Sequence, residues 1–384
     1  MIIRATVSVI AVMIVFGCGT GDVVQDASPD EAVDPGRIDG ARIYDYDPST
    51  ELGDDIFGDI IADLENDAPG RCTHGGPVCM EYADGRIVAF HTNTTDHNVD
   101  GWTEYAESSD GGRTWKRYNK FQYSYDQYDA ERKRSVWVEE GLVTEKGSAV
   151  LFLTHFRFGE GKRDSGFMRS LDHGATWSDY QPIDGDFVGY PCAVAVSGET
   201  NYVLYDSKDG GPHVLYSSSD DGLSWTRRST LPLDDDKWYG TMVVMADGRL
   251  LAGAYTEKDE HHFYYCISQD QGHTWGEQRK TYVDKMIRDP ELAYLGGKYY
   301  LHGRSGQEGE GSRRFVLYQS DDGIDWGGGI IVSGDTRHPD GYSHNCIINR
   351  YNDQEPLKLM VEYSIIYDGR DTNEYVFFIE PDPR

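Results

Sequence analysis

Short apolar runs separated by tight polar turns make up most of the chain after residue 70. Each run has the length of a strand, and the turn after the first run of each group contains Gly, Asp or Asn. Six such turns are present: ADGR (83–86), EKGS (145–148), SGET (197–200), ADGR (246–249), LGGK (295–298) and NDQE (352–355). They are typical of hairpins, so the pattern predicts six units that each begin with an antiparallel pair of strands.

A polar eight-residue segment follows the third predicted strand of five units. The copies are SSDGGRTW, SLDHGATW, SSDDGLSW, SQDQGHTW and QSDDGIDW, ending at Trp115, Trp177, Trp225, Trp275 and Trp326. The Asp can accept hydrogen bonds from N–H groups inside the turn, and the Ser and Thr hydroxyls can close the loop. The Trp is expected to pack between neighbouring sheets. The last copy has Gln319 and Asp325 at the hydroxyl positions, and we interpret it as degenerate.

The copies recur about every 50 residues, a period that indicates stacked units, none of which buries its apolar surface alone. Six four-stranded units arranged radially form a β-propeller, which protects its sheet edges by closing into a ring. The content of 27 Tyr and 8 Trp agrees with β structure, where aromatic side chains pack well. We therefore predict an all-β, six-bladed β-propeller over residues 51–384.

The first 17 residues combine Arg4 with an apolar stretch, Ala5–Phe16, that is too short to span a bilayer. Followed by Cys18, this segment resembles a bacterial lipoprotein signal peptide, which implies lipidation of Cys18; an ordinary secretory signal is the alternative. In either case we expect a protein outside the cytoplasm. It would be anchored to the cell envelope or secreted, and would contact the membrane only through an N-terminal lipid.

Two further segments precede the repeats. Residues 18–50 are acidic and rich in Gly and Pro, so we predict a flexible tether. In residues 51–66, Ile56, Ile60 and Leu64 recur at helical spacing and predict a short amphipathic helix.

The formal net charge of −30, from 36 basic and 66 acidic residues, argues against nucleic acid as a partner, because phosphate binding needs a basic surface. It agrees with a soluble, solvated surface, and we expect a monomer.

Strand direction indicates where chemistry can occur. The repeated eight-residue segments that end in Trp are called boxes. If the hairpin turns and the boxes lie at one end of the ring, the first strand of each unit begins, and the second strand ends, at the other end. Polar residues at those positions are Arg71, His91, His155, Arg157, Tyr190, Tyr239, Asp289, Arg304, Tyr342, His344 and Glu362, and the connecting loops add Asp96, Asp100, Arg313 and Arg314. Because guanidinium groups pair well with carboxylates, the cluster predicts an acidic glycan as ligand.

Five boxes in this rhythm resemble the sialidase superfamily, whose propellers carry the BNR repeat. The resemblance implies that Tyr342, in the segment DGYS, is the nucleophile. It also implies that Asp96 or Asp100, in TTDHNVDG, is the acid/base. A phenol suits attack beside a substrate carboxylate, which would repel an anionic nucleophile.

The resemblance further implies a carboxylate clamp formed by Arg71, Arg304 and one of Arg313 and Arg314. Blade four departs from the family pattern, since Tyr239 and Tyr255 occupy the positions of the family's Glu and Arg. In that case Glu362 or Asp289 would activate Tyr342.

The expected function is an exo-acting, retaining glycoside hydrolase for a terminal acidic sugar that needs no metal or other cofactor. A polysaccharide lyase acting on uronates is one alternative, in which Arg157 would neutralise the carboxylate and His155 or Tyr190 would move the proton. A non-catalytic glycan-binding lipoprotein is the other.

Ring closure would also bring Cys72 and His74 near His344 and Cys346. A zinc site or a Cys72–Cys346 disulfide would be possible there, but the spacing matches no known zinc pattern and buried Cys is often only a small apolar residue. We predict no metal.

Overall fold

Strands and turns account for nearly all of the structure. A computed structural model of the chain describes residues 37–38, 41–44, 54–55, 71–72, 77–95, 98–118, 120–160, 162–184, 189–207, 211–305, 315–333, 342–352, 354–365 and 373–381. In these residues the helices are α1 (Gln122–Gln127) and one 3-10 turn, Phe158–Glu160. The all-β prediction is confirmed.

The strands form six antiparallel units, or blades, in which the chain runs from the innermost strand outwards. Blade one is β5 (Val78–Glu81), β6 (Ile87–Thr95), β7 (Asn98–Ser108) and β8 (Lys116–Tyr118), with β4 (Arg71–Cys72) also paired to β6. Blade two is β9 (Arg134–Val143), β10 (Ala149–Arg157), β11 (Lys162–Ser170) and β12 (Gln181–Pro182). Blade three is β13 (Gly189–Ser197), β14 (Thr200–Ser207), β15 (Val214–Ser218) and β16 (Thr226–Thr230).

The second half of the ring repeats this order. Blade four is β17 (Trp238–Val244), β18 (Leu250–Tyr255), β19 (His262–Ser268) and β20 (Arg279–Tyr282). Blade five is β21 (Arg288–Leu295), β22 (Lys298–Arg304), β23 (Phe315–Ser320) and β24 (Ile330–Ser333). Blade six is β25 (Ser343–Ile348), β26 (Lys358–Ile365), β27 (Asn373–Pro381) and β2 (Ala41–Tyr44).

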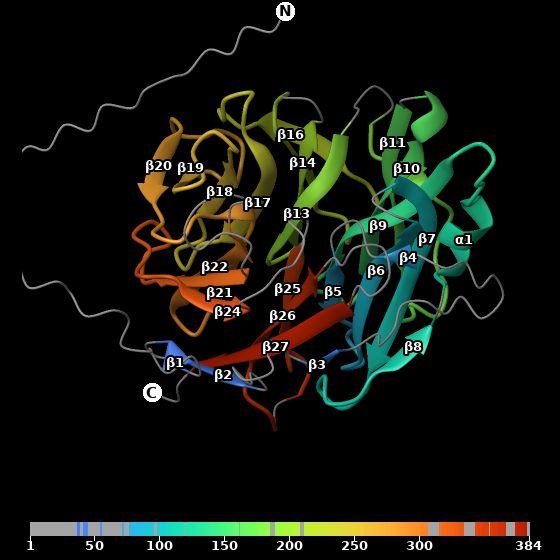
Figure 1. Cartoon of the computed structure of the whole chain (residues 1–384), viewed down its shortest axis with the longest axis horizontal. Coiled ribbons are helices and arrows are strands. Elements are labelled where there is room, and N and C mark those ends of the chain that lie inside the picture. Colours follow the sequence, from blue (N-terminus) through green and yellow to red (C-terminus); the bar gives the residue numbers. More distant parts are fainter. Residues whose placement is uncertain are drawn as a thin grey trace, which may run out of the picture. The chain divides into compact units, whose positions relative to one another are not determined.

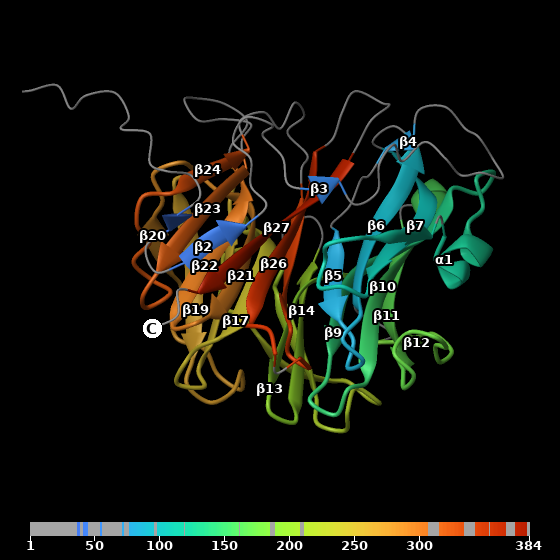
Figure 2. The same ribbon diagram turned by 90° about the horizontal axis from the view of Figure 1, so that it is seen from below.

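The innermost strands close a ring. Each of β5, β9, β13, β17, β21 and β25 contacts the next, and β25 contacts β5. Figure 1 shows the sheets around this axis, and Figure 2 shows the blades from the side. Hydrogen bonding divides the strands into five sheets rather than six, because one pair, Trp102 with Val136, joins blades one and two. The predicted propeller is therefore confirmed.

Blade six contains strands from both ends of the propeller. β2 pairs with β27 and with β1 (Arg37–Ile38), while β3 (Asp54–Asp55) pairs with the other end of β27. The N-terminal strand covers a sheet edge that would otherwise be open. The tether predicted for 18–50 and the boundary at residue 51 are thus wrong for residues 41–44, and the helix predicted for 51–66 is wrong at Asp54–Asp55.

The signal segment 1–17 and the lipidation candidate Cys18 lie outside the described residues, so both remain predictions. No helix in the part of the chain that the structure describes has the length and apolar character of a membrane span.

The boxes are closed hydrogen-bonded turns. In blade two, Ser170 Oγ donates to Asp172 (2.8 Å), and Asp172 accepts from the hydroxyl (2.6 Å) and the N–H (2.8 Å) of Thr176. The copies in blades one, three and four repeat this arrangement. In blade five Ser320 and Asp322 take the two roles, and no hydroxyl donates to the second Asp322 oxygen among the bonds described. That copy is one residue shorter and begins at Ser320 rather than at Gln319.

Each box also joins neighbouring blades at the end of the ring that carries the first hairpin turns. Arg86, in the turn of blade one, donates to His173 O in the box of blade two (2.7 Å). In the turn of blade two, Ser148 donates to Asp221 in the box of blade three (2.7 Å). Trp225 packs edge-on against Phe152 of blade two (4.9 Å between ring centroids). The boxes are therefore structural, as expected.

Candidate active site

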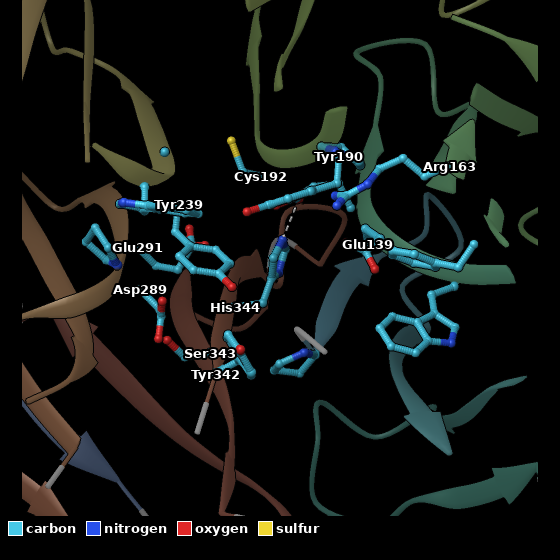
Figure 3. A pocket seen from close by; sticks show the side chains of 18 of the residues that line it. Glu139, Arg163, Tyr190, Cys192, Tyr239, Asp289, Glu291, Tyr342, Ser343 and His344 are labelled. Carbon is cyan, nitrogen blue, oxygen red and sulfur yellow. Dashed lines mark hydrogen bonds and ion pairs between the residues drawn. The ribbon is translucent and has the colours of Figure 1, made fainter. Parts of the chain in front are cut away.

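A cavity of about 260 Å³ opens on the ring axis (Figure 3). All six blades contribute to its wall, and no box residue does. The lining residues are Pro77, Trp137, Glu139, Glu140, Phe156, Phe158, Arg163, Tyr190, Pro191, Cys192, Trp238, Tyr239, Gly240, Asp289, Pro290, Glu291, Tyr342, Ser343 and His344.

β-bulges in four innermost strands bring consecutive residues to this wall. The strand register shifts once in each of β9, β13, β17 and β21, leaving one extra residue beside the cavity. In β9 the extra residue is Glu139, so Glu139 and Glu140 both reach the cavity. In β17 and β21 the bulges contain Tyr239 and Asp289, each at φ +47°. A bulge re-aims side chains, and positive φ at non-glycine residues is strained and concentrated at functional sites.

One wall holds the predicted nucleophile. The Arg304 guanidinium lies over the Tyr342 ring (5.4 Å to the centroid) and forms an ion pair with Asp289. The Tyr239 ring is 6.0 Å from that of Tyr342. Burial lowers the pKa of Arg304, but the Asp289 carboxylate and the Tyr342 and Tyr255 phenols together raise that pKa above its usual value. Burial raises the pKa of Tyr239, while a hydrogen bond with Tyr342 lowers it. Arg304 therefore places a permanent positive charge against the Tyr342 phenol.

The opposite wall holds a second cation among aromatic rings. The Arg163 guanidinium lies 5.2 Å from the ring centroid of Tyr190 and 5.8 Å from that of Phe156. Figure 3 shows Arg163, Tyr190 and Glu139 on this side. Guanidinium groups held over aromatic faces are favourable and fixed in orientation.

Two acids near this wall keep their protons at unusually high pH. Burial raises the pKa of Glu139 to about 8, although Arg163 partly opposes the shift. Burial also raises the pKa of Asp206 to about 7, although hydrogen bonds from the N–H of Tyr239 (2.9 Å) and the hydroxyl of Tyr190 (3.3 Å) oppose the shift. Raised carboxyl pKa values in a cavity are typical of functional sites.

His344 separates this cavity from a second one, of about 480 Å³, on the same axis; Glu140 and Glu291 also line both. The Cys79 N–H donates to His344 Nδ1 (3.2 Å), so Nε2 carries the hydrogen and donates to Glu140 (2.9 Å). Both ring nitrogens are used within the protein, and His344 therefore orients Glu140.

Several predicted site residues do share the cavity. Tyr190, Tyr239, Asp289, Tyr342 and His344 line it. Arg304 contacts two of these lining residues, Tyr342 and Asp289.

Other predictions fall outside the described residues. Asp96, Arg313 and Arg314 are not described, and for Arg71 and Asp100 only the backbone is, in β4 and β7. The acid/base and the complete arginine clamp thus remain predictions. The same holds for the proposed pairing of Cys72 and His74 with the last blade. In the described part of the chain, Cys79, Cys192, Cys266 and Cys346 are free thiols, and no group of His, Cys, Asp and Glu has the arrangement of a metal site.

Two predicted residues lie away from the cavity because they are buried inside blades. His91 Nε2 pairs with Glu104 (3.2 Å), and both side chains are inaccessible to solvent. Glu362 is also fully buried, and neither carboxylate oxygen has a hydrogen-bond partner among the described residues. Their assignment to substrate binding and to catalysis is therefore wrong.

The residues of the lyase alternative do not meet. His155 and Arg157 line a separate cavity in blade two, whereas Tyr190 lines the central one. His155 accepts or donates a hydrogen bond with Tyr123 (3.2 Å) and packs on Tyr180, and burial lowers its pKa to about 4. Arg157 pairs with Asp164. The two side chains stabilise the rim of the blade.

Sequence reasoning missed Glu139 and Arg163. Strand alternation contains the signal for Arg163: it pairs with Phe156, between His155 and Arg157, and so faces the opposite side of the sheet. Glu139 had no comparable signal, because the bulge that exposes it adds one residue without a Gly or Pro.

The closed ring, the repeated boxes and the axial cavity define the chain as an Asp-box β-propeller. Residues 159–340 match the BNR repeat-like domain, and the fold is similar to that of solved sialidases.

Similar solved structures share this fold at low sequence identity. A Dyadobacter fermentans protein of unknown function is 14% identical, with 90% of this chain and 100% of that one covered (TM-score 0.63). The intramolecular trans-sialidase of Ruminococcus gnavus is 14% identical, covering 84% and 97% (TM-score 0.58). A Penicillium chrysogenum alpha-L-arabinanase is 14% identical, covering 79% and 92% (TM-score 0.55). No curated protein matches the chain.

Proposed function

We propose that the protein is an exo-acting, retaining glycoside hydrolase that removes a terminal acidic sugar, with Tyr342 as its nucleophile. The observation that carries the proposal is the contact of Arg304 with Tyr342, which lines the axial cavity. The similar structures support glycan chemistry in general, since they include a trans-sialidase and an arabinanase.

Charge at the site supports a tyrosine nucleophile. Tyr342 attacks the anomeric carbon, and its proton leaves to Asp289, which lines the same cavity and is held by Arg304. The positive charge over the ring stabilises the phenolate that forms. The resulting glycosyl–tyrosine bond is then cleaved by water, which retains the anomeric configuration. Protonation of the leaving oxygen belongs to Asp96 or Asp100, as the resemblance implies.

The proposal is tested with a panel of 4-methylumbelliferyl glycosides of sialic acid, uronic acids and neutral pentoses. We expect release of a reducing acidic sugar by the wild type. Tyr342→Phe should lower kcat/KM more than about 1000-fold, because it removes the nucleophile. Tyr282→Phe is the matched control, since Tyr282 is 58% exposed outside the cavity.

Three outcomes would contradict the proposal. Binding without turnover would indicate the non-catalytic glycan-binding protein. An unsaturated product would indicate the lyase, despite the separation of His155 from Tyr190. Full activity of Tyr342→Phe would exclude the assigned nucleophile.

A further inference from the structure

The cation of the blade-two wall is placed for binding a ligand. Arg163 lies in β11 opposite Phe156 of β10, and both side chains line the cavity. The rings of Phe156 and Tyr190 both lie within 6 Å of the guanidinium. These contacts fix its position without using its hydrogen-bond donors.

Arg163 lines the cavity and differs in its partners from three other arginines of the propeller. Arg304 is paired with Asp289, Arg288 with Glu257 and Glu260, and Arg157 with Asp164. Within the described ranges no carboxylate lies at ion-pair distance from Arg163. A partly buried guanidinium is stabilised by an anionic partner, and here that partner can come from the ligand.

The acid Glu139, which lines the same cavity, leaves this position open at neutral pH. Glu139 is close enough for Arg163 to influence its ionisation, but it remains protonated up to about pH 8, its pKa being raised mainly by burial. A neutral carboxyl neither cancels the guanidinium charge nor repels an anion.

We propose that Arg163 is the carboxylate-binding group of the sugar subsite, and that ionisation of Glu139 closes this subsite to anions. The inference rests on the proposed function for the kind of ligand, but its test measures binding and needs no turnover. It assigns recognition of the acid group to blade two, whereas Arg304 serves Asp289 and the nucleophile.

Other groups facing Arg163 shape the pH dependence. The positive charge of Arg163 also lowers the pKa of Asp206, which burial raises to about 7. Tyr190 remains a neutral phenol because burial raises its pKa. Glu140 faces Glu139 and is held by His344. Affinity for an anion should therefore fall from about pH 7, as Asp206 ionises, and fall further above pH 8, as Glu139 does.

The binding experiment uses the full chain and two probes that differ only in the acid group, D-glucuronate and D-glucose, with N-acetylneuraminate as a third. Calorimetric titration at pH 6 gives the dissociation constants. Arg163→Met should weaken binding of the acidic probes about 10- to 100-fold, the usual cost of one charged hydrogen-bonding group, and leave glucose unchanged. Arg163→Lys should recover part of the loss. Arg132→Met, at a side chain 70% exposed, should change nothing.

The pH arm isolates Glu139. In the wild type, affinity for the acidic probe should decrease by up to about tenfold per pH unit above pH 8, as expected for coupling to one proton. Glu139→Gln should abolish this loss of affinity above pH 8 and keep the smaller loss of affinity near pH 7. Thermal unfolding confirms that each variant is folded.

The result that overturns the proposal is equal affinity of wild type and Arg163→Met for the acidic probes, or no acidic probe binding to the wild type. Failure of the proposed function looks different. Acidic probes would then bind through Arg163 in a protein that hydrolyses no glycoside.

Discussion

The box end and the cavity end of the blades treat carboxyl groups in opposite ways. Hydrogen bonds from the Thr176 hydroxyl and N–H lower the pKa of Asp172 to about 2, and those of Thr274 do the same for Asp270. At the cavity, burial raises the pKa of Glu139 to about 8 and that of Asp206 to about 7. The boxes therefore stabilise charged carboxylates with hydrogen-bond donors from neighbouring residues. At the cavity, by contrast, the donors and cations do not offset the cost of burying a carboxylate, as is typical of catalytic and binding sites.

The difference also explains how each end responds to change. A box is a run of consecutive residues whose side chains and N–H groups form hydrogen bonds with one another. The cavity brings together side chains from six blades, and its ion pair is almost completely buried.

The largest effect is expected from Asp289→Asn at the cavity. Arg304, which is 3% exposed, would lose the Asp289 carboxylate, and removing one side of a buried ion pair costs about 3–5 kcal/mol of unfolding free energy. Loss of the proton acceptor should also lower kcat/KM at least about 100-fold. Urea unfolding and kinetics measure the two effects.

Asp172→Asn provides the matched change at a box, and it should leave kcat/KM unaltered. Wild-type stability and activity in Asp289→Asn would remove the contrast between the two ends.

Particular residues show how much of the structure could be predicted from the sequence. The boxes and hairpin turns predicted ring closure because their signals lie within a few consecutive residues. Closure in turn brought Tyr342, Asp289 and Arg304 together as predicted.

What could not be predicted depends on single-residue shifts in strand pairing. A bulge in β9 turns Glu139 into the cavity, and side-chain alternation in β10 and β11 sends His155 to the rim but Arg163 to the cavity. Both effects follow from register, which the sequence specifies only through the assembled sheet. The strand β2 was missed for a related reason: four residues, ARIY, gain their strand partner only from the other end of the chain.

An intermediate effect is expected from Glu362→Gln, which extends the comparison to an acid buried within a blade. Burial raises the pKa of Glu362 well above its usual range, so the folded state holds a proton that the unfolded state releases above about pH 4.5. Its contribution to stability is therefore complete at low pH and is lost as pH rises. The unfolding free energy of the wild type should fall relative to that of Glu362→Gln by up to about 1.4 kcal/mol per pH unit.

Urea unfolding between pH 4 and pH 8 measures this difference, and parallel curves for the two proteins would contradict it. Activity of Glu362→Gln should equal that of the wild type, because the side chain does not reach the cavity. A large loss of kcat in a normally folded Glu362→Gln would restore Glu362 to the catalytic site.

The smallest effect is expected from Asp172→Ala in the box of blade two, and its pH dependence has the opposite sign. Asp172 has a lowered pKa in the folded state, so its contribution to stability is present above about pH 4 and disappears as pH falls towards 2. The carboxylate is exposed, and we expect Tm to fall by only a few degrees at pH 7. The Tm difference from wild type should shrink as pH is lowered. Scanning calorimetry measures both, and a difference that grows in acid would show that the box does not stabilise its Asp as an anion.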